Sequence, residues 1–393
     1  MAINYRRTLI RCTFIFLVLA IPLSTMIPSG AQLEAKGRGR AGSSCGITLT
    51  PSGYVFQWLH VQSGYIVASS GCVINLKGFN LPDTGYGNAT GLPPAKLFAK
   101  IGWFAQTFTM NVWRVSLNAV WWNEDVPVPM AGMGYRAWIQ QLVQVLESNG
   151  NYVLLTKGPQ FHELPCGGVV TYCPAQNQGA IDIKKDPYNP VYQQQLTTGV
   201  YISDAVAMWT SVAALYANDP AVLYDDWNEM HQISPALWRQ NSQILIDTIR
   251  SQNPQSLIFF GGNHYENGFS PLIRGLVPPL TEPNLVYDFH VYNGFVGIFQ
   301  GKRCIEPLST LWADWPIDAN MQVGYAQTHG GAASFSEWGG CNDIEPYNTV
   351  ITQFAAATHI MLGYYDSDMV TLPGFPLQLN SNGLKVQADY ASY

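Results

Sequence analysis

Apolar positions along the chain follow two alternating patterns. Short runs rich in β-branched and aromatic residues alternate with longer segments whose apolar residues recur at helical spacing. The short runs predict eight strands, at residues 73–79, 109–117, 152–156, 222–227, 257–261, 285–291, 333–336 and 360–365. Helical spacing between the strands is clearest at residues 135–148, 203–217, 234–251 and 347–356. Strands that alternate with helices indicate an α/β fold with a parallel sheet, and eight such units predict a (β/α)8 TIM barrel.

Two segments depart from this alternation. Residues 54–59 and 65–68, separated by Ser63 and Gly64, predict a small β-hairpin that could close the bottom of the barrel. Residues 157–198 form a long insertion after the third strand, rich in Pro, Gly, Gln and Asn. Because this insertion leaves the C-terminal end of a strand, we expect it to overhang the face where barrel enzymes build their sites.

The N-terminus has the organisation of an export signal. Arg6, Arg7 and Arg11 are followed by an apolar run over residues 12–23 and by small residues up to Ala31. A membrane anchor is the alternative, but this run is shorter than the roughly 20 residues that span a bilayer. We therefore expect a signal peptide over residues 1–31, a linker over 32–44 and one catalytic barrel over 45–393, secreted as a monomer without stable membrane insertion.

The charge balance argues against some classes of partner. The chain has a formal net charge of −6, and loss of the three signal arginines would make it −9. Net negative charge disfavours nucleic acid and anionic membranes as partners. Charged residues make up only 12% of the chain, below the usual level of about 25%. Such a composition suits a neutral, hydroxyl-rich ligand, although any secreted protein with an uncharged surface would share it.

The chain contains seven cysteines, of which Cys12 lies in the predicted signal. An even number in an exported chain predicts disulfides, although the sequence does not settle their connectivity. The pairs that would brace neighbouring segments are Cys45 with Cys72, Cys166 with Cys173, and Cys304 with Cys341. A zinc site is the alternative, and it is disfavoured because the sequence has no Cys-x-x-Cys pair or close Cys/His cluster. We expect neither a metal nor another cofactor.

Two glutamates end apolar runs in different predicted strands. Glu229 follows Asn228 after the fourth strand, and Glu337 ends the seventh. Two carboxyl groups at the tips of two strands are what hydrolysis of a glycosidic bond requires. Trp227 and His231 beside Glu229 favour a raised pKa and a general acid, while Glu337 suits a nucleophile. One such glutamate alone would more simply be the first-turn acid of a helix.

A similar triplet, Trp122-Asn123-Glu124, lies several residues past the second strand. We interpret it as loop and do not assign Glu124 to the site. Trp338, directly after Glu337, is the preferred candidate for stacking on a sugar ring.

Three further polar residues lie in predicted strands. Arg114 would be costly inside a barrel strand unless it is paired, and Glu337 is its natural partner. His290 and Tyr292 are two residues apart and therefore face the same side of their strand, where they can orient two carboxylates. A structural ion pair and buried structural polar groups are the alternatives for these residues.

Together these motifs resemble glycoside hydrolase family 5, the large cellulase family of retaining β-glycosidases. The resemblance rests on Asn228-Glu229, His290-Val291-Tyr292, Ser336-Glu337-Trp338-Gly339, Arg114 and the first-strand motif Leu76-Lys77-Gly78-Phe79-Asn80. It implies that Glu229 is the acid/base and Glu337 the nucleophile. It also implies that Asn228 binds the sugar 2-hydroxyl and that Arg114 and Tyr292 keep Glu337 ionised. Retention predicts carboxyl groups only about 5–5.5 Å apart.

The chain departs from the family pattern at two strands. The family usually has a His at the end of the third strand, whereas here the nearest is His162, several residues later. It also tends to have a Trp on the eighth strand, where this chain has Tyr364 and Tyr365. We expect His162 and Tyr365 to contribute to substrate binding instead.

By this resemblance the expected activity is that of an endo-β-1,4-glucanase acting on a polysaccharide or oligosaccharide. A β-mannanase, an exo-β-glucanase and a glycolipid-directed β-glycosidase are the alternatives on the same scaffold. A catalytically degenerate carbohydrate-binding barrel is the alternative of another class.

Overall fold

The computed structural model describes residues 45–81, 93–128, 131–158, 200–230, 233–263, 266, 268–292, 319–339, 345–365, 371 and 376–392. The chain divides into two units, Met1–Ala41 and Gly42–Tyr393, and all described residues belong to the second. The predicted signal peptide and linker lie outside the described residues. So do nearly all of the long insertion and the cysteine pairs 166 with 173 and 304 with 341.

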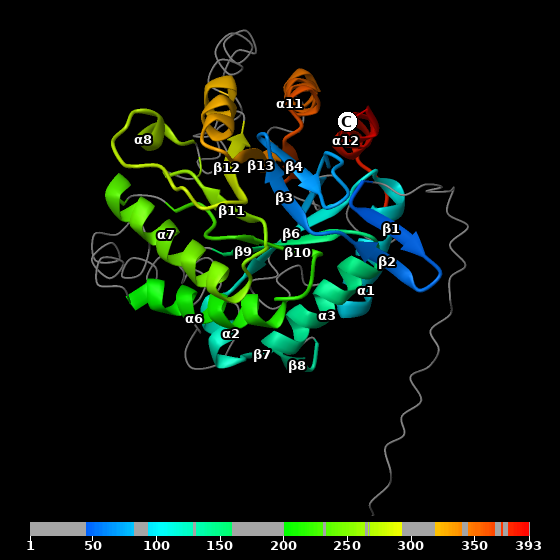
Figure 1. Ribbon diagram of the computed structural model, residues 1–393. Helices are drawn as coiled ribbons and strands as arrows, with labels where there is room; N and C mark the ends of the chain where they lie inside the picture. The colour runs from blue at the N-terminus through cyan, green and yellow to red at the C-terminus, as the bar shows by residue number, and fades with distance from the viewer. Residues whose placement is uncertain are drawn as a thin grey trace, which may run out of the picture. The chain divides into compact units, whose positions relative to one another are not determined.

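Eight parallel strands close into a barrel, which confirms the predicted (β/α)8 fold (Figure 1). Each strand pairs with the next along the chain, and the last pairs with the first. The strands are β5 (Lys77–Leu81), β6 (Val112–Leu117), β9 (Tyr152–Lys157), β10 (Val222–Asp225), β11 (Ile258–Gly261), β12 (Leu285–Tyr292), β13 (Ala332–Gly339) and β14 (Met361–Tyr364).

Helices lie on the outside of these strands, as Figure 1 shows. They are α1 (Pro94–Thr107), α2 (Ala119–Glu124), α3 (Tyr135–Ser148), α6 (Val200–Leu215), α7 (Pro235–Gln252), α8 (Ser270–Ile273), α11 (Glu345–Thr358) and α12 (Ser381–Ser392). In α7, the Ser234 side chain caps the first turn by accepting the Leu237 N–H, and Pro235 follows it. The apolar face of α7 then buries Trp238, Leu245 and Ile249. None of the described helices is long and apolar enough to span a membrane.

Short strands close the N-terminal end of the barrel. Two hairpins form here, β1 (Ile47–Thr50) with β2 (Gly53–Phe56) and β3 (Leu59–Gln62) with β4 (Tyr65–Ala68). Side chains from these hairpins share a buried cluster with the first residues of the barrel strands, and its members include Leu59, Ile66, Ala68, Val112, Tyr152, Leu257 and Met361. The predicted closure of the barrel bottom is confirmed.

Two local predictions were wrong. Residues 54–59 are not one strand, because β2 ends at Phe56 and β3 begins at Leu59 in a different hairpin. Residues 119–124 are not loop but the short helix α2, which Asn118 caps by accepting the Trp121 N–H at 2.9 Å. A third, small hairpin follows, β7 (Pro127–Val128) with β8 (Met133–Gly134).

A disulfide joins Cys45 to Cys72, which confirms the first of the predicted pairs. It ties the start of the first hairpin to the segment that leads into the barrel. The hairpins at the barrel bottom are thereby covalently fastened to its first strand.

Candidate active site

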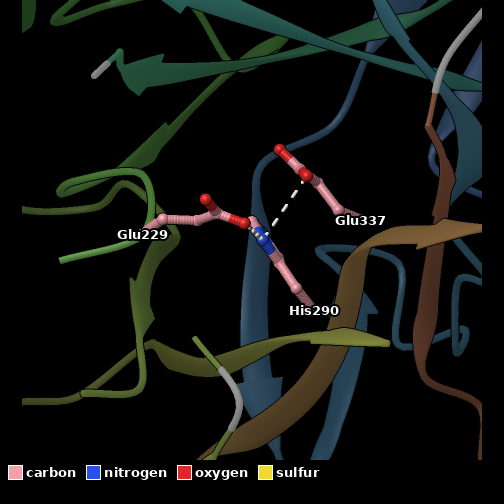
Figure 2. A group of neighbouring side chains, drawn as sticks. All are labelled: Glu229, His290 and Glu337. Carbon is pink, nitrogen blue, oxygen red and sulfur yellow. Dashed lines mark hydrogen bonds and ion pairs between the residues drawn. The ribbon is translucent and has the colours of Figure 1, made fainter. Parts of the chain in front are cut away.

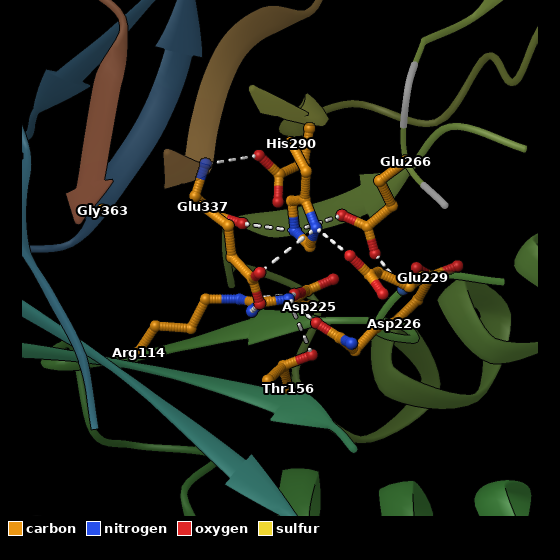
Figure 3. A network of polar contacts seen from close by, with 12 residues as sticks. Arg114, Thr156, Asp225, Asp226, Glu229, Glu266, His290, Glu337 and Gly363 are labelled. Carbon is orange, nitrogen blue, oxygen red and sulfur yellow. Dashed lines mark hydrogen bonds and ion pairs between the residues drawn. The ribbon is translucent and has the colours of Figure 1, made fainter. Parts of the chain in front are cut away.

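The polar centre of the molecule lies where β6, β10, β12 and β13 end. Figure 3 shows Arg114, Asp225, Glu229, Glu266, His290 and Glu337 gathered at this end of the strands. The sequence placed four of these residues in the site, namely Arg114, Glu229, His290 and Glu337. Asp225 and Glu266 were not assigned to it.

Glu229 and Glu337 both approach the same ring nitrogen of His290 (Figure 2). The His290 Nδ1 atom lies 2.9 Å from Glu229 Oε1 and 3.4 Å from Glu337 Oε2. One oxygen of each glutamate and the imidazole nitrogen all lie within 4.8 Å of one another. The two strand-tip carboxyl groups therefore face a common point.

A register shift between two barrel strands brings His290 and Glu337 side by side. The pairing of β12 with β13 shifts between Asp288 and His290, so that His290 lies opposite Glu337. Ser336 Oγ and Glu337 Oε2 each lie 3.4 Å from a ring nitrogen of His290, although consecutive strand residues normally point to opposite faces. A β-bulge is the usual device that re-aims a side chain in this way next to a site.

Arg114 connects the nucleophile candidate to the fourth strand. Its Nη1 atom donates to Glu337 Oε1 at 2.5 Å, and its Nε and Nη2 atoms donate to Asp225 Oδ2 at 3.0 and 2.7 Å. Nη2 also donates to Asn228 Oδ1 at 2.8 Å. Asn80 Oδ1 accepts a hydrogen bond from Nη1 at 3.1 Å, and Thr156 Oγ1 accepts one from Nη2 at 3.3 Å. The predicted pairing of Arg114 with Glu337 is confirmed, and it is part of a larger network.

The charges in this network account for its protonation. Burial opposes the charge on Arg114, but Asp225 and Glu337 raise its pKa above the ordinary value. Burial likewise opposes a charge on His290, but Glu266 and Glu337 raise its pKa well above the ordinary value. The cationic Arg114, which donates to Glu337, favours the ionised form of this carboxyl group.

Three buried carboxyl groups of the site were missed by the sequence analysis. Asp225 is fully buried and receives two donors of Arg114, and its place at the end of an apolar strand was a visible signal. Asp288, also fully buried, accepts the Ser336 N–H at 2.9 Å and the Ser334 hydroxyl. Glu266 follows β11 in a loop and has no pattern around it that marks it as buried.

Trp338 does not fit its predicted role as a sugar platform. Its exposed fraction is 0%, and it packs edge-on against Tyr364 with a centroid distance of 4.8 Å. Tyr390 of α12 lies on the same outer side, so Trp338 fills the layer between barrel and helix. A ring without exposed surface cannot stack on a sugar, and the prediction is wrong.

The other predicted binding residues are placed as follows. Tyr365 directly follows β14 and is 40% exposed, whereas Tyr364 is buried. Asn228 is 9% exposed beside Arg114. Tyr292 ends β12, but its side chain lies outside the described part of the structure, as do His162 and His231.

Two groups of site residues have donor atoms of the kind that bind metal ions. They are Glu229 with His290 and Glu337, and Glu266 with Asp288 and His290. Both depend on His290, whose two nitrogens lie 2.9 Å from Glu229 and from Glu266. These ion-pair contacts account for the positions of both ring nitrogens.

Several curated relatives match part of the chain. Endoglucanase N of Pectobacterium atrosepticum is 29% identical over 146 residues, which are 36% of this chain and 27% of that protein. Endo-beta-1,4-glucanase A of Emericella nidulans is 26% identical over 163 residues, which are 40% of this chain and 48% of that protein. The chain thus spans about a quarter to a half of the length of these relatives.

Solved structures share the fold at low identity. The β-glucanase SdGluc5_26A of Saccharophagus degradans is 16% identical with a TM-score of 0.61, over 90% of this chain and 98% of that chain. The catalytic domain of a Thermobifida fusca endoglucanase is 15% identical with a TM-score of 0.55, over 85% of this chain and 97% of that chain. Residues 67–369 match the family described as cellulase, glycosyl hydrolase family 5. Because this match covers most of the 393 residues, the chain belongs to the cellulase family, glycosyl hydrolase family 5.

Proposed function

We propose that the protein is a retaining endo-β-1,4-glucanase in which Glu337 is the nucleophile and Glu229 the acid/base. The observation that carries the proposal is the short separation of the two carboxyl groups, whose nearest oxygens lie within 4.8 Å around His290. Retaining glycosidases hold their carboxyl groups about 5–5.5 Å apart, whereas inverting enzymes need about 6.5–9.5 Å to admit a water. The observed spacing supports double displacement.

In the first step, a Glu337 carboxylate oxygen forms a bond to the anomeric carbon while the bond from that carbon to the leaving oxygen breaks. Glu229 gives its proton to that oxygen, so the leaving sugar departs as an alcohol. In the second step, water attacks the same carbon, Glu229 takes a proton from the water, and the bond to Glu337 breaks. Two inversions at one carbon leave the configuration retained.

The neighbours of the two glutamates suit these roles. Arg114 donates to Glu337 Oε1 and favours the ionised nucleophile. Asn228 uses its carbonyl oxygen to accept from Arg114, which orients its amide N–H groups for a sugar 2-hydroxyl. Tyr292, from the end of β12, is proposed as a second group that orients Glu337.

The substrate assignment rests on the relatives, which are named as endoglucanases. The low charge content of the chain suits a neutral glucan. We also propose that residues 1–31 direct secretion, so that the barrel acts on extracellular polysaccharide as a monomer.

A substrate panel with product analysis tests this proposal. Purified protein is incubated with carboxymethyl cellulose, mixed-linkage glucan, mannan, xylan and aryl β-cellobiosides, and the first product anomer is followed by NMR. We expect internal cleavage of β-1,4-glucan with β-configured products. First products of the α configuration would refute retention, and a preference for mannan would replace the glucanase by a mannanase. Carbohydrate binding without turnover on any substrate would indicate the binding barrel.

A further inference from the structure

Glu266 is a buried carboxyl group outside the residues proposed for catalysis. It follows β11 by five residues, and its exposed fraction is 0%. Burial raises its pKa to about 8, against the effect of the neighbouring His290. A carboxyl group is costly to bury unless it makes specific contacts, so the contacts of Glu266 need an explanation.

Glu266 contacts the proposed acid/base, Glu229, both directly and through His290 (Figure 3). Glu266 Oε1 accepts the backbone N–H of Glu229 at 2.5 Å, and Glu266 Oε2 lies 2.9 Å from His290 Nε2. The opposite ring nitrogen, His290 Nδ1, lies 2.9 Å from Glu229 Oε1. In addition, the backbone N–H of His290 donates to the backbone carbonyl oxygen of Glu266 at 2.9 Å. Glu266 therefore holds the main chain of Glu229 directly and its carboxyl group through His290.

The loop after β11 is shaped around this carboxyl group. A Cβ atom on Gly261, the last residue of β11, would lie only 2.3 Å from Glu266 Cδ. Glu266 itself has a φ of 53°, in the left-handed region that is unfavourable for a residue with a side chain. Glu229 has the same φ of 53°. Strained backbone at both ends of one hydrogen bond is typical of a functional constraint rather than of simple packing.

We propose that Glu266 is a positioning residue that holds His290 with a proton on Nδ1, directed at Glu229, and thereby fixes the orientation of the acid/base carboxyl group. This inference rests on the proposed function. It assigns to Glu266 the part that an outer carboxylate plays for a catalytic or metal-bound histidine, where the bond on one ring nitrogen sets the state of the other.

The charges around His290 favour this protonation. The groups that face or surround the ring are Glu229, Glu266, Glu337 and Asp288, with Arg114 beyond Glu337 and the Ser336 hydroxyl beside Nε2. This surplus of carboxylates raises the pKa of His290 above its ordinary value. Whether the proton between Glu266 and Nε2 lies on oxygen or nitrogen, Nδ1 keeps its own proton. The imidazole then donates to Glu229.

Replacing Glu266→Gln tests the role of its charge with little change of shape. On the basic side of the profile, where Glu266 is ionised, the substitution removes a negative charge beside His290 and weakens proton binding there. The basic limb of the kcat/KM profile should therefore move to lower pH. Cello-oligosaccharides, whose leaving group needs a proton, should lose about 10–100-fold in kcat/KM, the range seen when outer partners of histidine ligands are removed. A dinitrophenyl β-cellobioside, whose leaving group needs no proton, should change by less than about 3-fold.

Several controls separate this role from simple support of the fold. Glu124→Gln, at the exposed end of α2, should leave kcat/KM on both substrates and the pH profile unchanged. If Glu266→Gln lowered kcat/KM equally on both substrates and did not move the basic limb of the pH profile, the inference would be overturned. The proposed glucanase function would still stand. Absence of turnover by the wild type on every β-glycoside would instead overturn the proposed function.

A measurement on the wild type serves where the Gln variant does not fold. The nitrogen shifts of histidine imidazoles report which ring nitrogen carries a proton, and the His290 signal is identified by its loss in His290→Gln. We expect a protonated Nδ1 throughout the active pH range. An unprotonated Nδ1 at the pH of highest activity would refute the proposal.

Discussion

One guanidinium group organises the site at the scale of single residues. Arg114 is fully buried, and its five donors reach Glu337, Asp225, Asn228, Asn80 and Thr156. The planar fork of arginine meets several acceptors at fixed angles, which a lysine ammonium cannot do. The orientation of the proposed nucleophile therefore depends on the shape of this side chain as well as on its charge.

Arg114→Lys should lower both stability and activity. The substitution keeps the charge but loses several charge-assisted hydrogen bonds, each worth about 1.5–3 kcal/mol. We expect a fall of about 2–4 kcal/mol in the free energy of unfolding by urea, and at least a 10-fold fall in kcat from a misplaced nucleophile. Arg239→Lys is the matched control and should change both by little, because the Arg239 side chain donates, among the described residues, to the Pro278 and Pro279 carbonyls at the surface. If the two variants lost stability and kcat equally, Arg114 would not be the group that orients the proposed nucleophile.

The two glutamates should fail in different ways when replaced. Glu337→Gln removes the nucleophile and should abolish turnover of every substrate. Glu229→Gln should cost about 10²–10⁴-fold in kcat on cello-oligosaccharides, the usual contribution of general acid–base catalysis. On a dinitrophenyl cellobioside, Glu229→Gln should still form the glycosyl-enzyme, visible by mass spectrometry. Added azide should accelerate its release as a glycosyl azide of retained configuration, and a glycosyl azide of retained configuration from Glu337→Gln instead would reverse the two roles.

At the scale of elements, periodicity predicted the helices better than the strand ends. The apolar spacing over residues 135–148 coincides with α3. This helix is amphipathic along its whole length and buries one apolar face that includes Trp138, Ile139 and Leu142. The first barrel strand begins at Lys77 rather than at residue 73, since Val73 makes only an isolated bridge with Val67. An apolar run does not show which neighbour its backbone will pair with. The boundary is settled by hydrogen bonds that form only in the folded barrel.

The disulfide at the barrel bottom should stabilise the hairpin elements. Cys45 and Cys72 are separated by 27 residues, and closing a loop of this length in the unfolded chain is worth about 2–4 kcal/mol. Cys72→Ser should lower the midpoint of thermal unfolding measured by calorimetry. Because the bond lies at the opposite end of the strands from the glutamates, KM should stay the same. Addition of reductant should lower the wild-type midpoint toward that of the variant, and no difference between them would contradict a stabilising bond.

At the scale of the whole molecule, the sequence predicted which polar residues of the barrel strands lie together, but not the buried carboxyl groups around them. Arg114, His290 and Glu337 could be predicted because strand patterns place them at the same end of a parallel barrel. Glu266 could not, because its burial depends on the space left by Gly261 and on the path of an irregular loop. Trp338 was misassigned because the predicted strand ended at residue 336, whereas β13 continues to Gly339 and strand alternation turns Trp338 to the face opposite Glu337.

The buried acids of the barrel predict how stability varies with pH. Burial raises the pKa of Glu266 to about 8 and that of Asp288 to about 6, and it raises the pKa of Asp226 well above the ordinary value. The carboxylates around His290 raise its pKa as well. Each of these groups holds its proton more tightly in the folded than in the unfolded protein. Their contribution to stability is therefore complete at low pH and is lost as the pH rises through the folded-state values.

The free energy of unfolding by urea should accordingly fall between about pH 5 and pH 8. Asp288 contributes to the lower part of this window, and Glu266 and His290 to the upper part. Glu266→Gln removes one of the titrating groups, so its stability should depend less steeply on pH above about 6. Urea titrations of the wild type and the variant at four pH values measure both slopes. A wild-type stability that rises from pH 5 to pH 8 would mean that these carboxyl groups are ionised throughout, held by the charges of Arg114 and His290 rather than by protons.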